Sequence, residues 1–337
     1  MTLPAGEIEL AARAGQYFGV GDAVVSVERL PGAANRLWRV EVRAGRFVVK
    51  EFRYTTEDRR WLAALRTAAR FEHEVFATGE IVMPEPLQTA DGQTIVVMPG
   101  SRREIAAVRM HRWIDGAAVP LPITASAAEA GGALLAKVQA IGRRFATADT
   151  GTLRWWRWQP AHILELLEEH ALLDRDSAAE CRTIISEAER LIDMGEALPG
   201  PWLFSHYDIK PQNAKVVRQV MALLDWDEAA SCHPRLEAVE AALQWARVGE
   251  GRVEPELVAA FAEGFRAYGG ELSGVTRADF AKWAASRAIW FEYLGRRALQ
   301  EFDDDDEERA TAALEALATL SGLGVGLAEV PDWINSF

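Results

Sequence analysis

The segment from Phe204 to Ala229, FSHYDIKPQNAKVVRQVMALLDWDEA, constrains the fold more than any other part of this 337-residue chain. It begins with an H-x-D-x-x-x-x-N pattern and continues into two short apolar runs separated by a polar turn. Two such runs predict a β-hairpin, which brings the end of the second run back to the start of the first. Asn213, before the hairpin, and Asp225, after it, are therefore expected to lie beside each other.

The polar residues of this segment match the needs of phosphoryl transfer from ATP to a hydroxyl group. That reaction requires one carboxylate to receive or orient the hydroxyl proton, and hard oxygen ligands to hold Mg²⁺ on the phosphates. Asp208 is the candidate base, and Asn213 and Asp225 are the candidate metal ligands. The simpler alternative is a solvated turn in which Asp208 caps a helix and Asn213 closes a loop. The hairpin and the terminal Asp225 favour phosphoryl transfer, because a kinase signature counts only in the right structural context.

Length and composition bound the class of protein. The length exceeds the usual size of one hydrophobic core, so two lobes are expected. A net charge of −13 disfavours nucleic acid and anionic membranes as partners, and it could favour a cationic substrate, although solubility explains it more simply. Cys181 and Cys232 lie far apart without a C-x-x-C partner, and no apolar window is long enough to span a bilayer. These features predict a cytoplasmic protein. We expect a monomer or a homodimer.

The order of elements predicts an α+β fold with two lobes of the protein-kinase-like type. The first lobe, residues 1–112, is expected to hold an antiparallel five-stranded sheet with one main helix over Thr55–Thr78, and to bind the nucleotide. The second, residues 113–337, is expected to be larger, mostly helical, and to carry catalysis and substrate binding. The five expected strands are Ala23–Leu30, Arg36–Arg43, Arg46–Phe52, Gln93–Met98 and Ile105–Ile114. Expected helices of the second lobe include segments after Ala125, near Pro234, around Leu257–Phe265, over Arg277–Gln300 and over Ala310–Leu320.

Lys50 is the candidate for contact with the nucleotide phosphates. It ends the alternating run FVVK and so projects from a predicted strand, where it would be a fixed point charge held by a carboxylate on a nearby helix. The run FEHEVFATG offers Glu72 and Glu74, of which only one faces inward because two residues turn a helix by about 200°. We choose Glu72, because Phe71 and Val75 flank it on the buried side. The alternative for Lys50 is a surface lysine at the end of a strand.

Two loops are candidates for the rest of the nucleotide site. The turn from Gly32 to Asn35 joins two strands upstream of Lys50, and a small-residue hairpin there can lay backbone N–H groups over phosphates. A plain hairpin turn is the simpler interpretation, because neither the protein-kinase glycine pattern nor a P-loop is present. The segment MHRWIDG, from Met110 to Gly116, leaves the last strand of the first lobe. An interlobe linker of this kind can hydrogen-bond adenine through its main-chain groups.

Together these residues resemble the aminoglycoside phosphotransferase family, which lies in the wider protein-kinase-like group that includes choline kinases. The resemblance covers most of the chain and rests on VVK, SHYDIKPQN and LLDWDEA, and on DWDEAASCHPRLEAVEAAL, which is similar to the family's D-W-x-x-A…P…D-L-A pattern. It implies that Asp208 is the catalytic base and that Asn213 and Asp225 hold Mg²⁺. It also implies that Lys50, paired with Glu72, contacts the phosphates.

The same resemblance implies that main-chain groups of Arg112 and Ile114 hold adenine. Lys210 resembles the lysine that meets the γ-phosphate in protein kinases, although it could also be a surface charge. The chain departs from the family at two positions: Tyr207 stands where glycine is common, and Glu237 where aspartate is usual. The protein-kinase features D-F-G and A-P-E are absent, and only a short segment follows Asp225 before the next expected helix. A small-molecule acceptor is therefore favoured over a protein.

The acceptor itself is not fixed by the sequence. A cationic acceptor would need carboxylates in the second lobe, but each candidate could equally be a helix cap or a solvated residue. The tryptophan-rich run TLRWWRWQP could stack on a sugar, a base or a cyclic peptide, or could serve core packing. The carboxylate candidates are Asp227, Glu228, Glu237 and Glu240, and the tryptophans are Trp155, Trp156 and Trp158.

We therefore expect a phosphotransferase that uses ATP or GTP with Mg²⁺ and acts on a hydroxyl of an antibiotic or small metabolite. One alternative is a catalytically silent, kinase-like regulatory protein that binds nucleotide, although none of Lys50, Asp208, Asn213 and Asp225 is lost. A second is a helical scaffold or ligand-sequestering protein in which the loop match is coincidental. A third is a true protein kinase, which the missing activation segment disfavours.

Overall fold

The computed structural model describes residues 5–21, 23–30, 35–53, 59–101, 105–145, 159–248, 252–301 and 307–321. The chain divides into two compact units. Unit 1 comprises residues 1–119 and 212–230, and unit 2 comprises residues 120–211 and 231–337. Residues 212–230, which the sequence analysis assigned to the second lobe, thus cluster with the first. The assignment of nucleotide binding to one lobe and substrate binding to the other stays a prediction.

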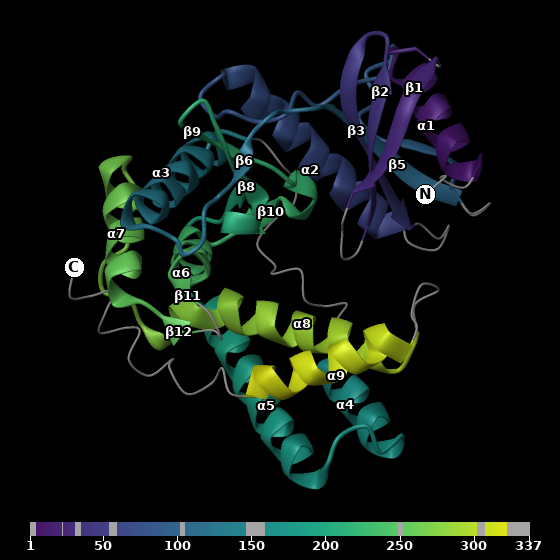
Figure 1. The fold of residues 1–337 in the computed structure, drawn as a ribbon. Helices are drawn as coiled ribbons and strands as arrows, with labels where there is room; N and C mark the ends of the chain where they lie inside the picture. The colour runs from purple at the N-terminus through teal and green to yellow at the C-terminus, as the bar shows by residue number, and fades with distance from the viewer. Residues whose placement is uncertain are drawn as a thin grey trace. The chain divides into compact units, whose positions relative to one another are not determined.

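Unit 1 is built on a five-stranded antiparallel sheet (Figure 1). The strand order is β1-β2-β3-β5-β4, so β5 lies between β3 and β4, although β4 precedes it in the chain. The predicted sheet is confirmed, with limits close to those expected from alternation and turns. The strands are β1 (Val24–Leu30), β2 (Arg36–Val42), β3 (Gly45–Arg53), β4 (Val96–Pro99) and β5 (Ile105–Arg112).

A different helix covers each face of this sheet. Helix α1 (Ala5–Tyr17), which the sequence analysis did not identify, packs Leu10 into a buried cluster with Val49. Helix α2 (Arg59–Thr78), the predicted main helix, packs Leu62 against Phe52 on the other face. Successive residues of a strand point to opposite faces. Lys50, one residue after Val49 and two before Phe52, therefore lies on the α2 face.

The predicted hairpin is present in unit 1. Strands β8 (Ala214–Val217) and β9 (Val220–Leu223) pair antiparallel, and β6 (Ala117–Ala118) extends them to a three-stranded sheet. Arg218 and Gln219 both have positive φ values, 47° and 68°, which is the backbone geometry of a tight type I′ turn. The hairpin is preceded by the short helix η2 (Pro211–Asn213) and followed by η3 (Trp226–Glu228).

Unit 2 is mainly helical, as predicted (Figure 1). Helices α4, α5, α8 and α9 share a buried apolar cluster that includes Ile163, Ile185 and Leu294. Helix α3 packs closely on α7: a Cβ atom at Gly132 would lie 2.0 Å from the Phe261 carbonyl oxygen, so only glycine fits there. The helices are α3 (Ala125–Gly142), α4 (Pro160–Glu169), α5 (Arg175–Glu196), α6 (Pro234–Trp245), α7 (Pro255–Ala267), η4 (Arg277–Phe280), α8 (Ala281–Ala298) and α9 (Glu307–Ser321). Short strands are β7 (Leu203–Ser205), β10 (Ala230–Cys232), β11 (Arg247–Val248) and β12 (Arg252–Val253).

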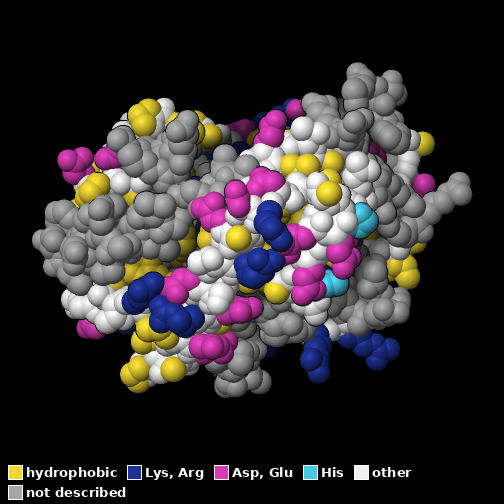
Figure 2. Space-filling model, turned by 90° about the horizontal axis from the view of Figure 1, so that it is seen from below, with side chains coloured by type: hydrophobic (Ala, Val, Ile, Leu, Met, Phe, Trp, Pro, Cys, Tyr) yellow, Lys and Arg dark blue, Asp and Glu magenta, His cyan; other side chains and the backbone are white. Residues whose placement is uncertain are grey.

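The surface carries both signs of charge. Figure 2 shows acidic and basic side chains interspersed over the described part of the face that it presents.

Within the described ranges, no helix combines the length and apolar character needed to cross a membrane.

Candidate active site

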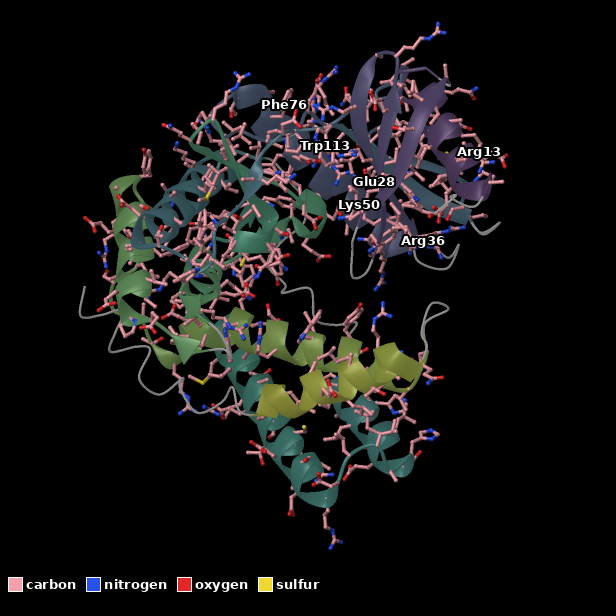
Figure 3. All side chains as sticks on the ribbon, viewed as in Figure 1. Arg13, Glu28, Arg36, Lys50, Phe76 and Trp113 are labelled. Carbon is pink, nitrogen blue, oxygen red and sulfur yellow. The ribbon has the colours of Figure 1, made fainter. Side chains whose placement is uncertain are left out.

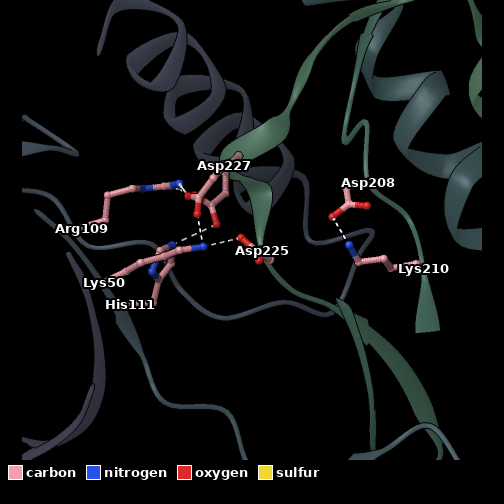
Figure 4. Close-up of polar contacts among 8 residues, drawn as sticks. Lys50, Arg109, His111, Asp208, Lys210, Asp225 and Asp227 are labelled. Atoms are coloured by element: carbon pink, nitrogen blue, oxygen red, sulfur yellow. Dashed lines mark hydrogen bonds and ion pairs between the residues drawn. The ribbon is translucent and has the colours of Figure 1, made fainter. Parts of the chain in front are cut away.

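Six ionisable side chains of unit 1 meet around Lys50, on the α2 face of the sheet. We call them the Lys50 cluster. Figure 3 labels Lys50 on the ribbon, and Figure 4 shows its ammonium directed at Asp225 and Asp227. The members of the cluster are Lys50, Glu72, Arg109, His111, Asp225 and Asp227.

Strand register explains why the basic members lie together. In the antiparallel pairing of β3 with β5, Lys50 is opposite Arg109 and Val48 is opposite His111. Cross-strand partners of this kind project from the same face. Glu72 is buried on α2, the helix that covers this face.

Aromatic packing positions the acidic members. The Trp226 ring lies edge-on to the Phe71 ring of α2, with centroids 6.0 Å apart, and is almost fully buried. Because Trp226 stands between Asp225 and Asp227, this packing holds both carboxylates beside the sheet. Asp225 has a left-handed backbone, with φ of 62°, a conformation that aspartate tolerates better than most residues.

The pairing within the Lys50 cluster differs from the one expected. The Lys50 ammonium lies 2.6 Å from Asp225 Oδ1 and also contacts Asp227. Arg109 donates to Asp227 Oδ1 at 2.5 Å and to Glu72, whose other oxygen lies 3.0 Å from His111 Nε2. Glu72, rather than Glu74, is thus the inward carboxylate, but it contacts Arg109 and His111 rather than Lys50. The reason is the forked guanidinium of Arg109, which bridges two carboxylates and leaves Lys50 to the Asp225–Asp227 pair.

Burial and charge set the protonation of these groups. Burial alone would lower the pKa of Lys50, but the carboxylates of Asp227 and Asp225 raise it above its ordinary value. Burial would raise the pKa of Asp227, but Lys50 and Arg109 hold it below its ordinary value. Burial of its surroundings raises the pKa of Asp225 despite Lys50, and the like charge of Asp227 adds to this. Burial and the Arg109 charge lower the pKa of His111 to about 3, so its ring is neutral at pH 7.

The charge balance of the Lys50 cluster suits a divalent cation. With His111 neutral, two cations face three carboxylates, so one negative charge is left over. Asp225 is the exposed member, since 44% of its side chain is accessible against 8% for Asp227 and 2% for Glu72. Carboxylate and amide oxygens are the hard ligands that Mg²⁺ prefers, with phosphate and water completing its shell. A set with three or more His, Cys, Asp or Glu ligands does not occur among the described residues.

The hairpin brings Asn213 back to the segment that holds Asp225. The Leu224 N–H donates to the Asn213 carbonyl oxygen at 2.8 Å, and Ala214 pairs with Leu223. Asn213 and Asp225 are therefore near neighbours across the open end of the hairpin. This is the arrangement that the sequence predicts for two metal ligands; their role stays a prediction.

The sequence predicts that Arg112 and Ile114 contact adenine and that the turn from Gly32 to Asn35 contacts the phosphates. The Arg112 N–H already donates to the Glu85 carbonyl oxygen at 2.9 Å. A main-chain hydrogen bond from Arg112 to a base would therefore use the Arg112 carbonyl group. The Ile114 backbone makes no hydrogen bond to another described residue. Asn35 is half-buried and immediately precedes β2, and Gly32 lies outside the described residues.

The candidate catalytic base lies in unit 2. Asp208 Oδ2 is 2.7 Å from the Lys210 ammonium (Figure 4). Burial would raise the pKa of Asp208, but Lys210, helped by Lys282 and His206, lowers it below its ordinary value. The carboxyl group is therefore ionised at neutral pH and able to accept a proton.

Tyr207, one of the two departures from the family pattern, has a left-handed backbone with φ of 71°. This geometry explains why glycine is common at the position, because glycine alone adopts it without steric cost. The Tyr207 ring is buried, and the Lys282 ammonium lies 4.2 Å from its centroid, a distance typical of a cation–π contact.

Glu237, the other departure, lies on α6 and supports the loop that carries Tyr207 and Asp208. Its Oε1 accepts the Tyr207 N–H at 2.7 Å, and its Oε2 accepts from Gln139 Nε2 at 3.1 Å. Glu237 is 1% exposed, so these hydrogen bonds replace its hydration. It is a positioning residue of the loop that carries Asp208.

Three of the four carboxylates considered for a cationic acceptor are engaged elsewhere. Asp227 belongs to the Lys50 cluster, Glu237 accepts the Tyr207 N–H, and Glu240 is buried against Lys282 and Ser286. Glu228 is exposed. The tryptophans Trp155, Trp156 and Trp158 lie outside the described residues.

Sequence reasoning did not identify Arg109 or Lys282. A signal for Arg109 existed: it is the charged residue in the middle of the apolar strand Val108-Arg109-Met110, opposite Lys50. Lys282 had no comparable signal, because it stands in a mixed helical segment and its buried partner Glu240 lies 42 residues away.

The family model described as "Phosphotransferase enzyme family" matches residues 26–280. Among curated proteins, none matches the sequence.

Solved structures are similar over nearly the whole chain. A microcompartment-associated aminopropanol kinase superposes with a TM-score of 0.68 at 14% identity, covering 96% of this chain and 98% of its own. A spectinomycin phosphotransferase in complex with ADP and spectinomycin gives a TM-score of 0.62 at 13% identity, with the same coverage. A choline/ethanolamine kinase family protein from Mesorhizobium loti gives 0.55 at 15% identity, covering 98% of this chain and 100% of its own. At these identities the likeness supports the fold.

Proposed function

Because this chain belongs to the phosphotransferase enzyme family, as its sequence resemblance predicted, we propose that it transfers the γ-phosphate of ATP or GTP to a hydroxyl of a small antibiotic or metabolite. Phosphorylation of an alcohol group is the shared activity of the family and its structural neighbours. The neighbours' acceptors, spectinomycin and aminopropanol, differ widely in size, and one was solved with ADP. They support a nucleotide as phosphoryl donor and a small molecule as acceptor.

The Lys50 cluster is the observation that carries this proposal. Its residues supply a strongly basic ammonium for the nucleotide phosphates and an exposed carboxylate, Asp225, next to the hairpin end at Asn213. Asn213 and Asp225 would hold Mg²⁺, which when bound neutralises negative charge on the phosphates. Arg109 forms ion pairs with both Glu72 and Asp227. Lys50 therefore stays paired with Asp225, in the segment that follows the hairpin.

Asp208 performs the proton transfer in the proposed reaction. The acceptor oxygen forms a bond to the γ-phosphorus while the bond from that phosphorus to the bridging oxygen breaks and leaves the diphosphate. The hydroxyl proton passes to the Asp208 carboxylate, which is ionised at neutral pH. Lys210, 2.7 Å from Asp208, keeps the carboxylate charged and supplies a cation next to the entering phosphoryl group.

The test combines nucleotide binding with turnover. Mg-ATP should raise the melting temperature, because a ligand that binds only the folded state stabilises it. A coupled assay of ADP release across aminoglycosides, peptide and nucleoside antibiotics and small metabolite alcohols should identify an acceptor. Asp208→Asn should lower its turnover about 10²- to 10⁴-fold, the usual contribution of a general base.

Asp193→Asn, at an exposed position of α5, is the matched control and should leave turnover unchanged. Near-normal turnover of Asp208→Asn would remove the proposed mechanism. Nucleotide binding without turnover on any acceptor would instead indicate a catalytically silent regulatory protein.

A further inference from the structure

Lys282 is a buried cation that contacts both helix α6 and the loop that carries the candidate base. We call residues 206–210 the Asp208 loop. The Lys282 ammonium, on α8, contacts the Glu240 carboxylate, on α6. It also lies 4.2 Å from the centroid of the Tyr207 ring, within the range of a cation–π contact. All these residues belong to unit 2.

Glu240 holds the Lys282 ammonium in a fixed place. Ser286, one helical turn after Lys282 and on the same face of α8, donates to the other oxygen of Glu240. Lys282 is 1% exposed and Glu240 6%. Burial lowers the pKa of Lys282, but a carboxylate in direct contact favours the charged form of an amine. Lys282, Glu240 and Ser286 therefore form a buried polar network whose cation faces the Tyr207 ring.

Helix α6 supports Tyr207 at two points. Glu237 and Glu240 are three residues apart, so they lie on the same face of this helix. Glu237 Oε1 accepts the Tyr207 N–H at 2.7 Å, while its Oε2 accepts from Gln139, on α3, at 3.1 Å. Glu240 reaches the Tyr207 ring through Lys282. The helix thus fixes the backbone of Tyr207 directly and its side chain through the lysine.

The Tyr207 backbone needs this support. Its φ of 71° is a left-handed conformation that a residue with a Cβ atom adopts at a steric cost. Strained backbone of this kind persists only where the surrounding structure fixes it from several sides. Asp208 is the next residue, so the direction of its carboxylate depends on the dihedral angles of Tyr207. The Lys282 charge also acts on Asp208, since it lowers the pKa of that carboxyl together with Lys210 and His206.

We propose that Lys282 is a positioning residue for Asp208: held by Glu240 and Ser286, its ammonium fixes the Tyr207 ring and thereby the backbone that aims the Asp208 carboxylate. Tyr207 and Lys282 act together, because the glycine that is common at position 207 has no side chain for a lysine to hold. The consequence for catalysis rests on the proposed function, whereas the fixing of the Asp208 loop does not.

The test uses the full chain with both charges of the buried pair removed, as the double variant Lys282→Met with Glu240→Gln. Lys282→Met alone leaves the Glu240 carboxylate buried without its cation, which is strongly destabilising, whereas replacing both members of a buried pair is often neutral. Glutamine keeps an oxygen for Ser286. Urea denaturation should show that the double variant is about as stable as the wild type.

Amide hydrogen exchange measures how firmly the Asp208 loop is held, without nucleotide or acceptor. The Tyr207 N–H should exchange about 10-fold faster in the double variant, because the loop opens more easily once its ring contact is lost. The Leu224 N–H, which donates to the Asn213 carbonyl oxygen in unit 1, should exchange as in the wild type. A difference confined to the loop separates loss of positioning from general destabilisation.

Turnover provides the second measurement. With the acceptor identified by the ADP-release assay, kcat of the double variant should fall about 10- to 100-fold, because a small displacement of a catalytic group is costly. The KM for Mg-ATP should stay unchanged, because the Lys50 cluster lies in unit 1 and keeps all its members. A variant damaged as a whole would instead lose stability and nucleotide affinity together.

Lys137→Met is the matched control. The Lys137 ammonium lies 4.8 Å from the centroid of the Tyr268 ring, a contact of the same kind in the same unit, but Tyr268 is 55% exposed and outside the Asp208 loop. Exchange of the Tyr207 N–H and kcat should both stay at their wild-type values in this variant.

Tyr207→Leu removes the ring and keeps the ion pair of Lys282 with Glu240. It should reproduce the faster exchange and the lower kcat, and it carries the test if the double variant does not fold. Added to the double variant, it should lower kcat by less than about 2-fold more, because both changes remove the same contact. Fully additive losses would overturn the proposed coupling of the ring to the lysine.

The outcomes separate this proposal from the phosphotransferase proposal. A folded double variant with wild-type exchange of the Tyr207 N–H would overturn the role of Lys282, and so would faster exchange with unchanged kcat. A wild type that releases no ADP with any acceptor would contradict the proposed function instead. The exchange measurement would then decide by itself whether Lys282 fixes the Asp208 loop.

Discussion

The Lys50 ammonium lies 2.6 Å from an Asp225 carboxylate oxygen, although 175 positions of the chain separate the two residues. The contact joins strand β3 to the segment after the β8–β9 hairpin, both within unit 1. Asp227 and Arg109 extend it into a network of buried charges. The stability of unit 1 and its proposed chemistry therefore depend on the same side chains.

Arg109 should be the member whose loss costs most stability. Arg109→Met leaves Glu72 and Asp227 buried with fewer partners, and breaking a buried pair in this way typically costs about 3 kcal/mol or more. Urea denaturation measures the free energy of unfolding. The control Arg39→Met removes an exposed arginine paired with Glu28 and should change it by less than about 1 kcal/mol. Equal effects of the two substitutions would show that the network does not stabilise unit 1.

Lys210 should set the acid limit of activity. The carboxylate form of Asp208 is the active one, so turnover falls as the pH drops through its pKa, which lies below the ordinary value of 3.8. Lys210 is the largest of the charges that lower this pKa, so Lys210→Met raises it and moves the acid limb of the pH–rate profile to higher pH. The exposed Arg182→Gln should leave the limb in place. A limb that does not move in Lys210→Met would contradict the assignment of Asp208 as base.

Tyr207 should reveal its strained backbone through two substitutions. Both Tyr207→Ala and Tyr207→Gly remove the buried ring, but only glycine adopts a φ of 71° without a steric penalty. The glycine variant should therefore be more stable than the alanine variant by about 1 kcal/mol, measured by chemical denaturation. The opposite order would mean that the loop does not keep its left-handed geometry in solution.

His111 should make the folded protein sensitive to acid. Its folded pKa of about 3 lies below the ordinary value of 6.5, so the unfolded chain binds a proton more readily and stability is lost as the pH falls from 6.5 toward 3. Burial, Arg109 and Lys50 lower this pKa against Asp225 and Asp227, while Glu72 contacts the ring. By pH 5 the loss should reach about 2 kcal/mol. His111→Gln should flatten this part of the stability curve, and a wild type equally stable at pH 7 and pH 5 would refute the assignment.

Local patterns in the sequence predicted the sheet, the main helix α2 and the β8–β9 hairpin, because alternation and turn residues act over a few positions. They also placed Asn213 and Asp225 at the two ends of the hairpin, which the register confirms. The prediction that Glu72 pairs with Lys50 failed for a different reason. The choice of Glu72 took account of helix periodicity but not of Arg109, whose position opposite Lys50 depends on the pairing of two strands that are not consecutive.

The second unit shows the same limit. Its helical character follows from periodicity, but the pairing of Lys282 with Glu240 depends on how α6 and α8 pack. Tyr207 could be recognised in the sequence as unusual. Its left-handed backbone, and the Glu237 oxygen that accepts its N–H, could not be recognised there because both depend on the folded loop.

Unit 1 takes residues 212–230 from the middle of the stretch that otherwise forms unit 2. A fragment ending at residue 119 would thus retain Lys50, Glu72 and Arg109 but lose Asp225 and Asp227, leaving two cations with one carboxylate on the α2 face of the sheet. Truncated versions, and chimaeras made by swapping the front of the chain with that of a relative, should accordingly misfold unless the hairpin insert is exchanged along with it.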